Sequence, residues 1–156
     1  MDPEGMVHAL KQVHRLLKPA GALIDIHPMP QLPHVEAYHE GRAIFSEPLL
    51  VSYLDGIMQA ESALAQVVEA GLFNAGKKSV IDFRHHAPSP QELFTHWDAI
   101  EPYSDSPKDP AVAASEKRMF RRLGSFLQTS RTPSKIAIRE RAAISCYISI
   151  NRARAS

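Results

Sequence analysis

The chain has 156 residues, of which 44% are apolar, and a formal net charge of +1 at pH 7. This length and composition predict one compact domain over residues 1–156, and the near-neutral charge does not favour a surface for nucleic acid or membrane. A single cysteine excludes a disulfide framework within the chain and a cysteine-based metal site. No apolar run approaches the roughly 18 residues that span a membrane and no signal peptide is recognisable, so we expect a cytoplasmic protein.

The first segment has the pattern of an amphipathic helix, a stop and a strand. Apolar residues recur at helical spacing over Met6–Leu17, after an Asp2-Pro3-Glu4 start that suits a helix N-terminus. Pro19 and Gly21 are expected to end this helix. The apolar run Leu23–Ile26 then predicts a short strand that is covered on both faces.

The middle of the chain predicts a hairpin, a long helix and a strand. Two β-prone runs around Gly41 indicate a hairpin over His34–Ser46. A helical pattern opens at Pro48 and ends at Gly71. The run Ser79–Arg84 is then typical of a strand.

The last third of the chain predicts two helices and a long alternating strand. Ser89-Pro90 and Asp109-Pro110 each offer a capping residue followed by a proline at the first helical position. From Ile136 to Ile150 the apolar residues share one parity, while polar residues such as Ser145 share the other. This alternation indicates one half-buried strand, or two strands bent near Glu140.

Two stretches of this pattern resemble class I S-adenosylmethionine (SAM)-dependent methyltransferases. The stretch AL-x-x-VHRLLKPAGALIDI is similar to the family's helix ending in R-V/L-L-K-P-G-G and its fifth strand, with Ala20 in place of the first glycine. The stretch ALAQVVEAGLFNAGKKSVIDF resembles the family's last large helix and sixth strand. The resemblance implies an α/β fold: a partial Rossmann-like sheet with its last three strands in the order 5-7-6, flanking helices and an inserted β-hairpin.

The same resemblance implies SAM-dependent methyl transfer as the ancestral activity. The family's glycine-rich turn and ribose-binding acidic residue would precede Asp2, so no cofactor-binding residue can be assigned and SAM is not expected to bind this chain alone. We therefore expect the C-terminal half of a methyltransferase, a truncated domain whose missing half would be encoded upstream in the same frame. The alternative is a non-catalytic module of the same origin that is dimeric or binds a partner. A weaker alternative is a small-ligand-binding protein that uses residues 27–45.

The loop after the first predicted strand carries the candidate site. His27 lies at the carboxyl end of that strand, where open α/β sheets bind ligands. A histidine there can take a proton from an acceptor nitrogen or oxygen, or orient the acceptor; alternatively, it caps the strand and meets solvent. The catalytic candidate is therefore His27, and the candidate substrate-binding residues are His27, Met29, His34 and Tyr38.

Two further groups of residues favour ordinary surface roles. The eight histidines lack the tight spacing of zinc-binding motifs, so no metal site is expected. The basic residues Lys117, Arg118, Arg121 and Arg122 form a short patch beside Glu116, which is more typical of a solvated helix face than of a nucleic-acid surface.

The first predicted strand also suggests how the chain meets a partner. In the family, the neighbour of this strand is the fourth strand, which the chain does not supply. An apolar strand edge without a neighbour is a template for pairing with another chain. We therefore expect a homodimer or a complementary chain, bound through the strand Ala22–His27 or the helix Met6–Leu17.

Overall fold

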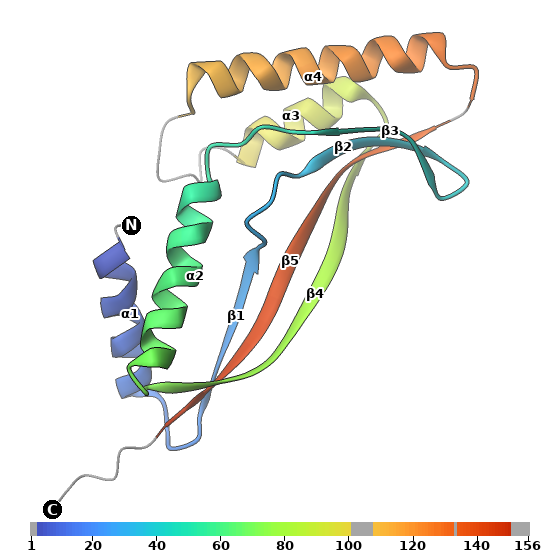
Figure 1. The fold of residues 1–156 in the computed structure, drawn as a ribbon. Coiled ribbons are helices and arrows are strands. Elements are labelled where there is room, and N and C mark those ends of the chain that lie inside the picture. The colour runs from blue at the N-terminus through green and yellow to red at the C-terminus, as the bar shows by residue number, and fades with distance from the viewer. Residues whose placement is uncertain (1–2, 101–107, 133, 151–156) are drawn as a thin grey trace, which may run out of the picture. The chain divides into compact units, whose positions relative to one another are not determined.

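The structure is a computed structural model that describes residues 3–100, 108–132 and 134–150. Within these residues the fold is mixed α/β, with four helices and a five-stranded antiparallel sheet (Figure 1). In chain order the elements are α1 (Pro3–Leu16), β1 (Ala22–Pro28), β2 (His34–His39), β3 (Arg42–Pro48), α2 (Leu54–Glu69), β4 (Phe73–Ala87), α3 (Pro90–Ile100), α4 (Pro110–Thr129) and β5 (Lys135–Ser149).

The long strand β5 holds the sheet together. The sheet order is β1-β5-β2-β3, and β4 also pairs with β5. Residues 142–148 of β5 pair with β1, and residues 135–139 pair with β2. A Rossmann-like sheet with the order 5-7-6 is not shown, because the sheet is antiparallel. The expected hairpin is not a separate insertion either, since β2 and β3 belong to this same sheet.

Contacts between residues group the chain into two compact units. Unit 1 comprises residues 1–30, 55–81 and 142–156, and unit 2 comprises residues 31–54 and 82–141. Both β4 and β5 contribute residues to each unit. The single domain expected from the length stays a prediction.

Local sequence signals explain the hairpin and the start of the two later helices. Glu40 and Gly41, between β2 and β3, both have positive φ angles, 48° and 80°, as a two-residue hairpin turn requires. Ser89 accepts a hydrogen bond from the backbone N–H of Glu92 at 3.2 Å and so caps α3. Asp109 caps α4 by accepting from the backbone N–H of Ala111 at 2.7 Å. These elements of the sequence prediction are confirmed.

Unit 2 has an apolar core between α3, α4 and the strands β2 and β5. Its buried members are Val35, Ala37, Leu49, Leu93, Trp97, Met119, Phe120, Leu123, Ile136 and Ile138. One acidic residue, Glu116, is buried beside this core and is only 2% exposed. It accepts a hydrogen bond from the indole of Trp97 at 3.1 Å and forms an ion pair with Lys108 at 2.8 Å. The buried charge is therefore compensated.

Unit 1 contains α1, β1, α2 and the adjoining parts of β4 and β5. The helix α2 buries Ile57, Ala63, Leu64 and Val67. Strand β1 is only partly covered: Ile24 is 55% exposed and Ile26 is 65% exposed. The prediction of a strand covered on both faces is therefore wrong. The cause is that Ile24 and Ile26 lie on one face of the strand and nothing in the described structure covers it.

None of the described helices combines the length and the apolar character needed to cross a bilayer.

Candidate functional site

Strand β1 separates polar and apolar side chains on its two faces. Asp25 and His27 are two residues apart, so their side chains lie on the same face of the strand. Ile24 and Ile26 lie on the opposite face and are largely exposed. The polar face of β1 is thus the one that meets other side chains of unit 1.

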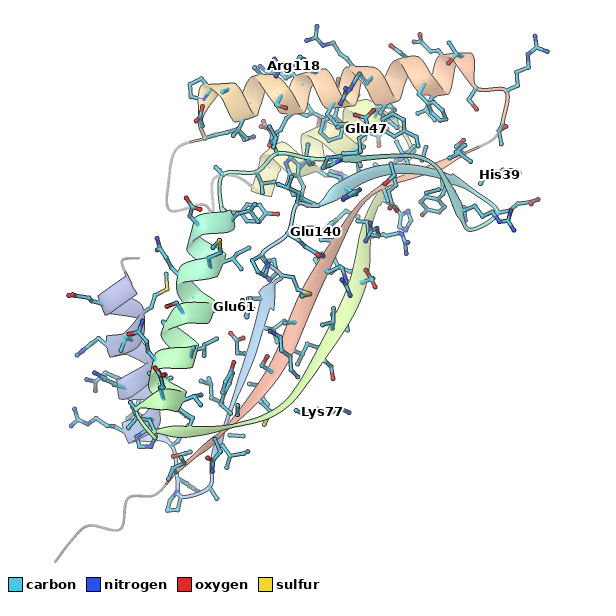
Figure 2. The ribbon with its side chains drawn as sticks, in the orientation of Figure 1. His39, Glu47, Glu61, Lys77, Arg118 and Glu140 are labelled. Atoms are coloured by element: carbon cyan, nitrogen blue, oxygen red, sulfur yellow. The ribbon has the colours of Figure 1, made fainter. Side chains whose placement is uncertain are left out.

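His27 lies between two carboxylates. Its Nδ1 atom is 2.6 Å from Oδ2 of Asp25, and its Nε2 atom is 3.3 Å from Oε1 of Glu61 on α2. The same Oε1 accepts a hydrogen bond from Lys78 at 3.2 Å. Figure 2 shows Glu61 on α2, the helix that lies beside β1. A neutral imidazole donates from only one nitrogen, so both carboxylates accept from His27 only when both ring nitrogens carry protons.

The charges of the cluster support one another. Burial acts to raise the pKa of Glu61, but hydrogen bonds from Lys78 and His27 and their positive charges outweigh it. The pKa of Glu61 therefore lies below its ordinary value of 4.5. The arrangement of Asp25, His27 and Glu61 ties α2 to β1 and places an imidazole, held by a carboxylate, near the end of a strand.

A buried hydroxyl adjoins this cluster. Ser145 of β5 is the register partner of Asp25, so the two side chains lie on the same face of the sheet. Ser145 is 4% exposed, and its Oγ atom has no hydrogen-bond partner among the described residues. The alternating pattern of the sequence predicted that Ser145 lies with the other polar residues on the exposed face of a half-buried strand. Because Ser145 is buried, this prediction is wrong at this position.

The backbone of β1 leaves one edge open. Ser149 donates its N–H to the carbonyl of Gly21 at 2.8 Å, and the register continues with Ala22 opposite Ile148. In an antiparallel pair every second residue exchanges both hydrogen bonds, so the odd-numbered residues of β1 bond to β5. The even-numbered residues 22, 24 and 26 direct their N–H and C=O groups away from β5. Within the described residues β1 pairs with β5 only.

The other sheet edges differ from β1 in charge. Strand β4 also pairs with β5 alone, but it carries Lys77, Lys78 and Arg84, and lysine is a common protection against edge-to-edge pairing (Figure 2 labels Lys77). Strand β3 carries Arg42 and Glu47. On β1 the one acidic side chain, Asp25, is bonded to His27, and the exposed face is apolar.

The predicted substrate-binding residues are divided between the two units. His27 and Met29 belong to unit 1, whereas His34 and Tyr38 belong to β2 in unit 2. His34 is within 3.0 Å of the Ser46 hydroxyl, and the Tyr38 hydroxyl is 2.8 Å from Nδ1 of His86.

Unit 2 has polar networks of its own. Buried Glu36 accepts from Arg139 at 2.7 Å, and that hydrogen bond raises the pKa of Arg139 despite partial burial. Glu140 accepts a hydrogen bond from Tyr53 at 2.9 Å and lies 3.1 Å from His85. Burial and the neighbouring Glu140 raise the pKa of Tyr53. These contacts give Glu36, Tyr53 and Glu140 partners within unit 2.

Helix α4 carries the basic residues noted in the sequence on its exposed side. Lys117, Arg118 and Arg121 are exposed, as the solvated-face interpretation expects (Figure 2 labels Arg118). An open hollow of about 440 Å³ lies against α3 and α4, where Phe94 and Phe120 meet edge to face. Lys117 and Arg121 line it, but its shape is too open to define a ligand.

The part of the chain that the structure describes contains no group of residues that matches a metal site or the family's SAM site. No group of three or more His, Cys, Asp or Glu residues in that part could hold a metal ion. The family's cofactor turn needs glycines between a strand and the following helix. Gly21 and Gly71 instead follow helices, Gly41 lies in the hairpin and Gly76 lies within β4. The described residues therefore do not fit the family's SAM site.

No known protein family, no curated protein and no solved structure gives a significant match to the chain. The methyltransferase resemblance is therefore a proposal that depends on the quoted stretches alone.

Proposed function

We propose that the chain is a non-catalytic partner-binding module of methyltransferase origin, which joins another polypeptide through the open edge of β1. The observation that carries this proposal is the combination of outward backbone groups and exposed isoleucines on one strand. Residues 22, 24 and 26 direct their hydrogen-bonding groups away from β5, and Ile24 and Ile26 are exposed.

Pairing at this edge is physically favourable for two reasons. An added strand satisfies the outward N–H and C=O groups, which is how β-augmentation gains affinity. It also removes apolar surface from water, and fully burying one isoleucine side chain is worth about 1.5–3 kcal/mol. The polar cluster supports this role because Asp25 and His27 anchor β1 to α2 through the other face and leave the edge free.

Site-specific photo-cross-linking tests the proposal in the organism that makes the chain. A photoreactive phenylalanine derivative replaces Ile26 on β1 and, as the matched control, Val80 on β4, which is 41% exposed in the same unit. We expect cross-linked products from position 26 and none above background from position 80.

The variant Ile24→Pro decides whether a cross-linked product reports strand pairing. The N–H of Ile24 points away from β5, so proline there keeps the pairing with β5 and removes a donor from the open edge. Products that vanish in Ile24→Pro support the proposal, whatever their mass. Products that persist, or no products from position 26, contradict it.

Methyl transfer is a second candidate function, and two observations favour it. Strand β5 pairs with both β1 and β4, as the seventh strand does with the fifth and sixth in the family that the sequence resembles. His27 also lies near the carboxyl end of β1, where it could hold or take a proton of an acceptor. Because the described residues do not fit SAM, this candidate requires that residues outside the described ones hold the cofactor.

Calorimetric titration with SAM separates the two functions. For the non-catalytic module we expect no saturable heat with the purified chain or with the chain co-purified with its bound partner. Saturable binding only by the co-purified complex would favour methyl transfer. Binding of SAM by the isolated chain would contradict the conclusion that the described glycines are not placed as the family's SAM site requires.

A further inference from the structure

We infer that the partner of β1 is β1 of a second copy of this chain, paired antiparallel about a two-fold axis that passes Ile24. The inference rests on the proposed function, since it names the occupant of the same edge. A two-fold interface uses one surface on both copies, so the edge must be complementary to itself. The direction of the backbone groups, the side chains and the charges of β1 each bear on whether its edge is complementary to itself.

The backbone meets the requirement only in a few registers. The residues with outward N–H and C=O groups are 22, 24 and 26, so hydrogen-bonded pairs between copies must join even-numbered residues. With the axis at Ile24, Ile24 exchanges two hydrogen bonds with Ile24 of the second copy. Ala22 and Ile26 then form one further hydrogen-bonded pair on each side of the axis. All three outward residues of each copy are used.

The side chains agree with this register. Cross-strand pairs place side chains on the same face about 4.5–5.5 Å apart. Ile24 then lies opposite Ile24 of the second copy, and Ala22 lies opposite Ile26. All three residues are exposed in the single chain, and the pairing brings their side chains into contact across the two strands. On the other face Leu23 lies opposite Asp25, so no like charges face each other.

The two registers shifted toward the C-terminal end of β1 are worse for identifiable reasons. An axis at Asp25 sets two aspartates directly opposite each other, and like charges in that position are destabilising. An axis at Ile26 pairs Ile24 with Pro28, which has no N–H to donate. Strand β4 is a poorer edge for self-pairing because Lys77 and Lys78 lie along it.

The mass of the full chain in solution is the first measurement. We expect light scattering at micromolar concentration to give twice the chain mass of 17.3 kDa. Ile24→Lys sets two lysines opposite each other on the axis and is expected to weaken dimerisation at least about tenfold. Ile24→Val keeps a β-branched side chain and should stay dimeric, and Val80→Lys, on β4, should also leave the dimer intact.

Disulfide trapping then determines which residues of β1 lie opposite each other in the two copies. Cys146 is the register partner of Ile24 on β5, so the experiment uses a Cys146→Ser background. Ile24→Cys should link two copies, because hydrogen-bonded antiparallel partners lie about 5.5 Å apart, within disulfide range. Ile26→Cys alone should not, because a four-residue offset separates the two positions by about 14 Å. Mixing Ala22→Cys with Ile26→Cys chains should restore a link.

The outcomes distinguish this inference from the proposed function. A monomer in solution with no link at position 24 overturns the inference, and so does self-linking at position 26. If position 26 cross-links to a different polypeptide in the cell and Ile24→Pro abolishes this, the proposed function stands while the second-copy inference fails. A dimer that links at position 24 and separates in Ile24→Lys supports both.

Discussion

The Nδ1 atom of His27 lies 2.6 Å from Oδ2 of Asp25, two residues earlier on the same strand. Alternation along β1 places both side chains on one face, so local geometry alone brings them together. The contact fixes one ring nitrogen and leaves Nε2 to reach Glu61 on α2. A helix and an edge strand that are distant in sequence are thereby joined through one imidazole.

His27→Ala should destabilise the protein by about 0.5–1.5 kcal/mol, the usual net contribution of a hydrogen bond, because its partners are only partly buried. Two carboxylates, those of Asp25 and Glu61, would lose the imidazole that lies between them. The control is His8→Ala, because His8 is exposed on α1, where its Nε2 atom lies 3.4 Å from the side-chain amide of Gln12. Surface changes of that kind usually stay within about 0.5 kcal/mol. Urea unfolding of both variants measures the difference, and equal losses would show that the cluster contributes nothing to stability.

Glu61→Gln should change how the free energy of unfolding depends on pH. The pKa of Glu61 is lower in the folded protein than its ordinary 4.5, so its charge stabilises the fold above pH 4.5. This contribution is lost as the pH falls through the lowered value. The stability difference between wild type and variant should therefore be constant near neutrality and shrink below pH 4.5. Thermal unfolding across the pH range follows it; a difference that grows in acid would reverse the assigned sign.

Proline substitutions at Leu23 and Ile24 should separate the two edges of β1. The N–H of Leu23 points toward β5 and that of Ile24 points away. Leu23→Pro therefore removes a ladder hydrogen bond and should cost about 1–3 kcal/mol more than Ile24→Pro. Unfolding should be compared at a concentration where both variants have the same mass in solution. Equal destabilisation would mean that the assigned backbone direction is wrong.

Local signals predicted the elements whose causes are local. The hairpin followed from a turn at Gly41, and α4 followed from Asp109 and the proline after it, because capping and turn geometry involve neighbours in sequence. The sheet did not follow. The resemblance implied a Rossmann-like order, whereas strand pairing is decided by contacts between residues such as Val35 and Ile138, which are far apart in the chain.

The candidate site was predictable only in part, for the same reason. The i, i+2 spacing of Asp25 and His27 was visible in the sequence and could have been read as one polar face. The third member, Glu61, lies 34 residues beyond His27, and no local pattern connects them. Ser145 was expected on the polar parity but is buried, because packing from distant segments decides which face of β5 is covered.

Two glycine substitutions should have opposite effects on stability. A Cβ at Gly21 would lie 2.8 Å from the carbonyl oxygen of Lys18, so Gly21→Ala forces the backbone to shift and should destabilise the protein. A Cβ at Gly124, inside α4, would meet nothing within 4 Å. Gly124→Ala should therefore stabilise the fold by about 0.5–1 kcal/mol through helix propensity. Differential scanning calorimetry compares the two, and a lower melting temperature for Gly124→Ala would refute the assignment of open space there.

The ion pairs of Lys108 offer a comparison of a buried and an exposed carboxylate at one lysine. Glu116 is 2% exposed and lies 2.8 Å from Lys108, whereas the side chain of Asp98 is 55% exposed and lies 3.3 Å from it. Glu116→Ala should cost about 3–5 kcal/mol, because it removes the buried carboxylate that lies closest to the Lys108 ammonium and leaves the indole of Trp97 without its acceptor. Asp98→Ala should cost about 0–1 kcal/mol, since solvent screens that pair.

Glu116→Gln completes the comparison, because its amide oxygen can still accept from Trp97 while the negative charge opposite Lys108 is lost. Its cost should fall between those of Glu116→Ala and Asp98→Ala, as measured by urea unfolding of the three variants. If Glu116→Gln were as stable as wild type, the charge would be dispensable and the hydrogen bond to Trp97 would be the contact that matters. If Asp98→Ala matched Glu116→Ala, burial would not be what separates the two carboxylates, and the packing of Glu116 against the core of unit 2 would need another explanation.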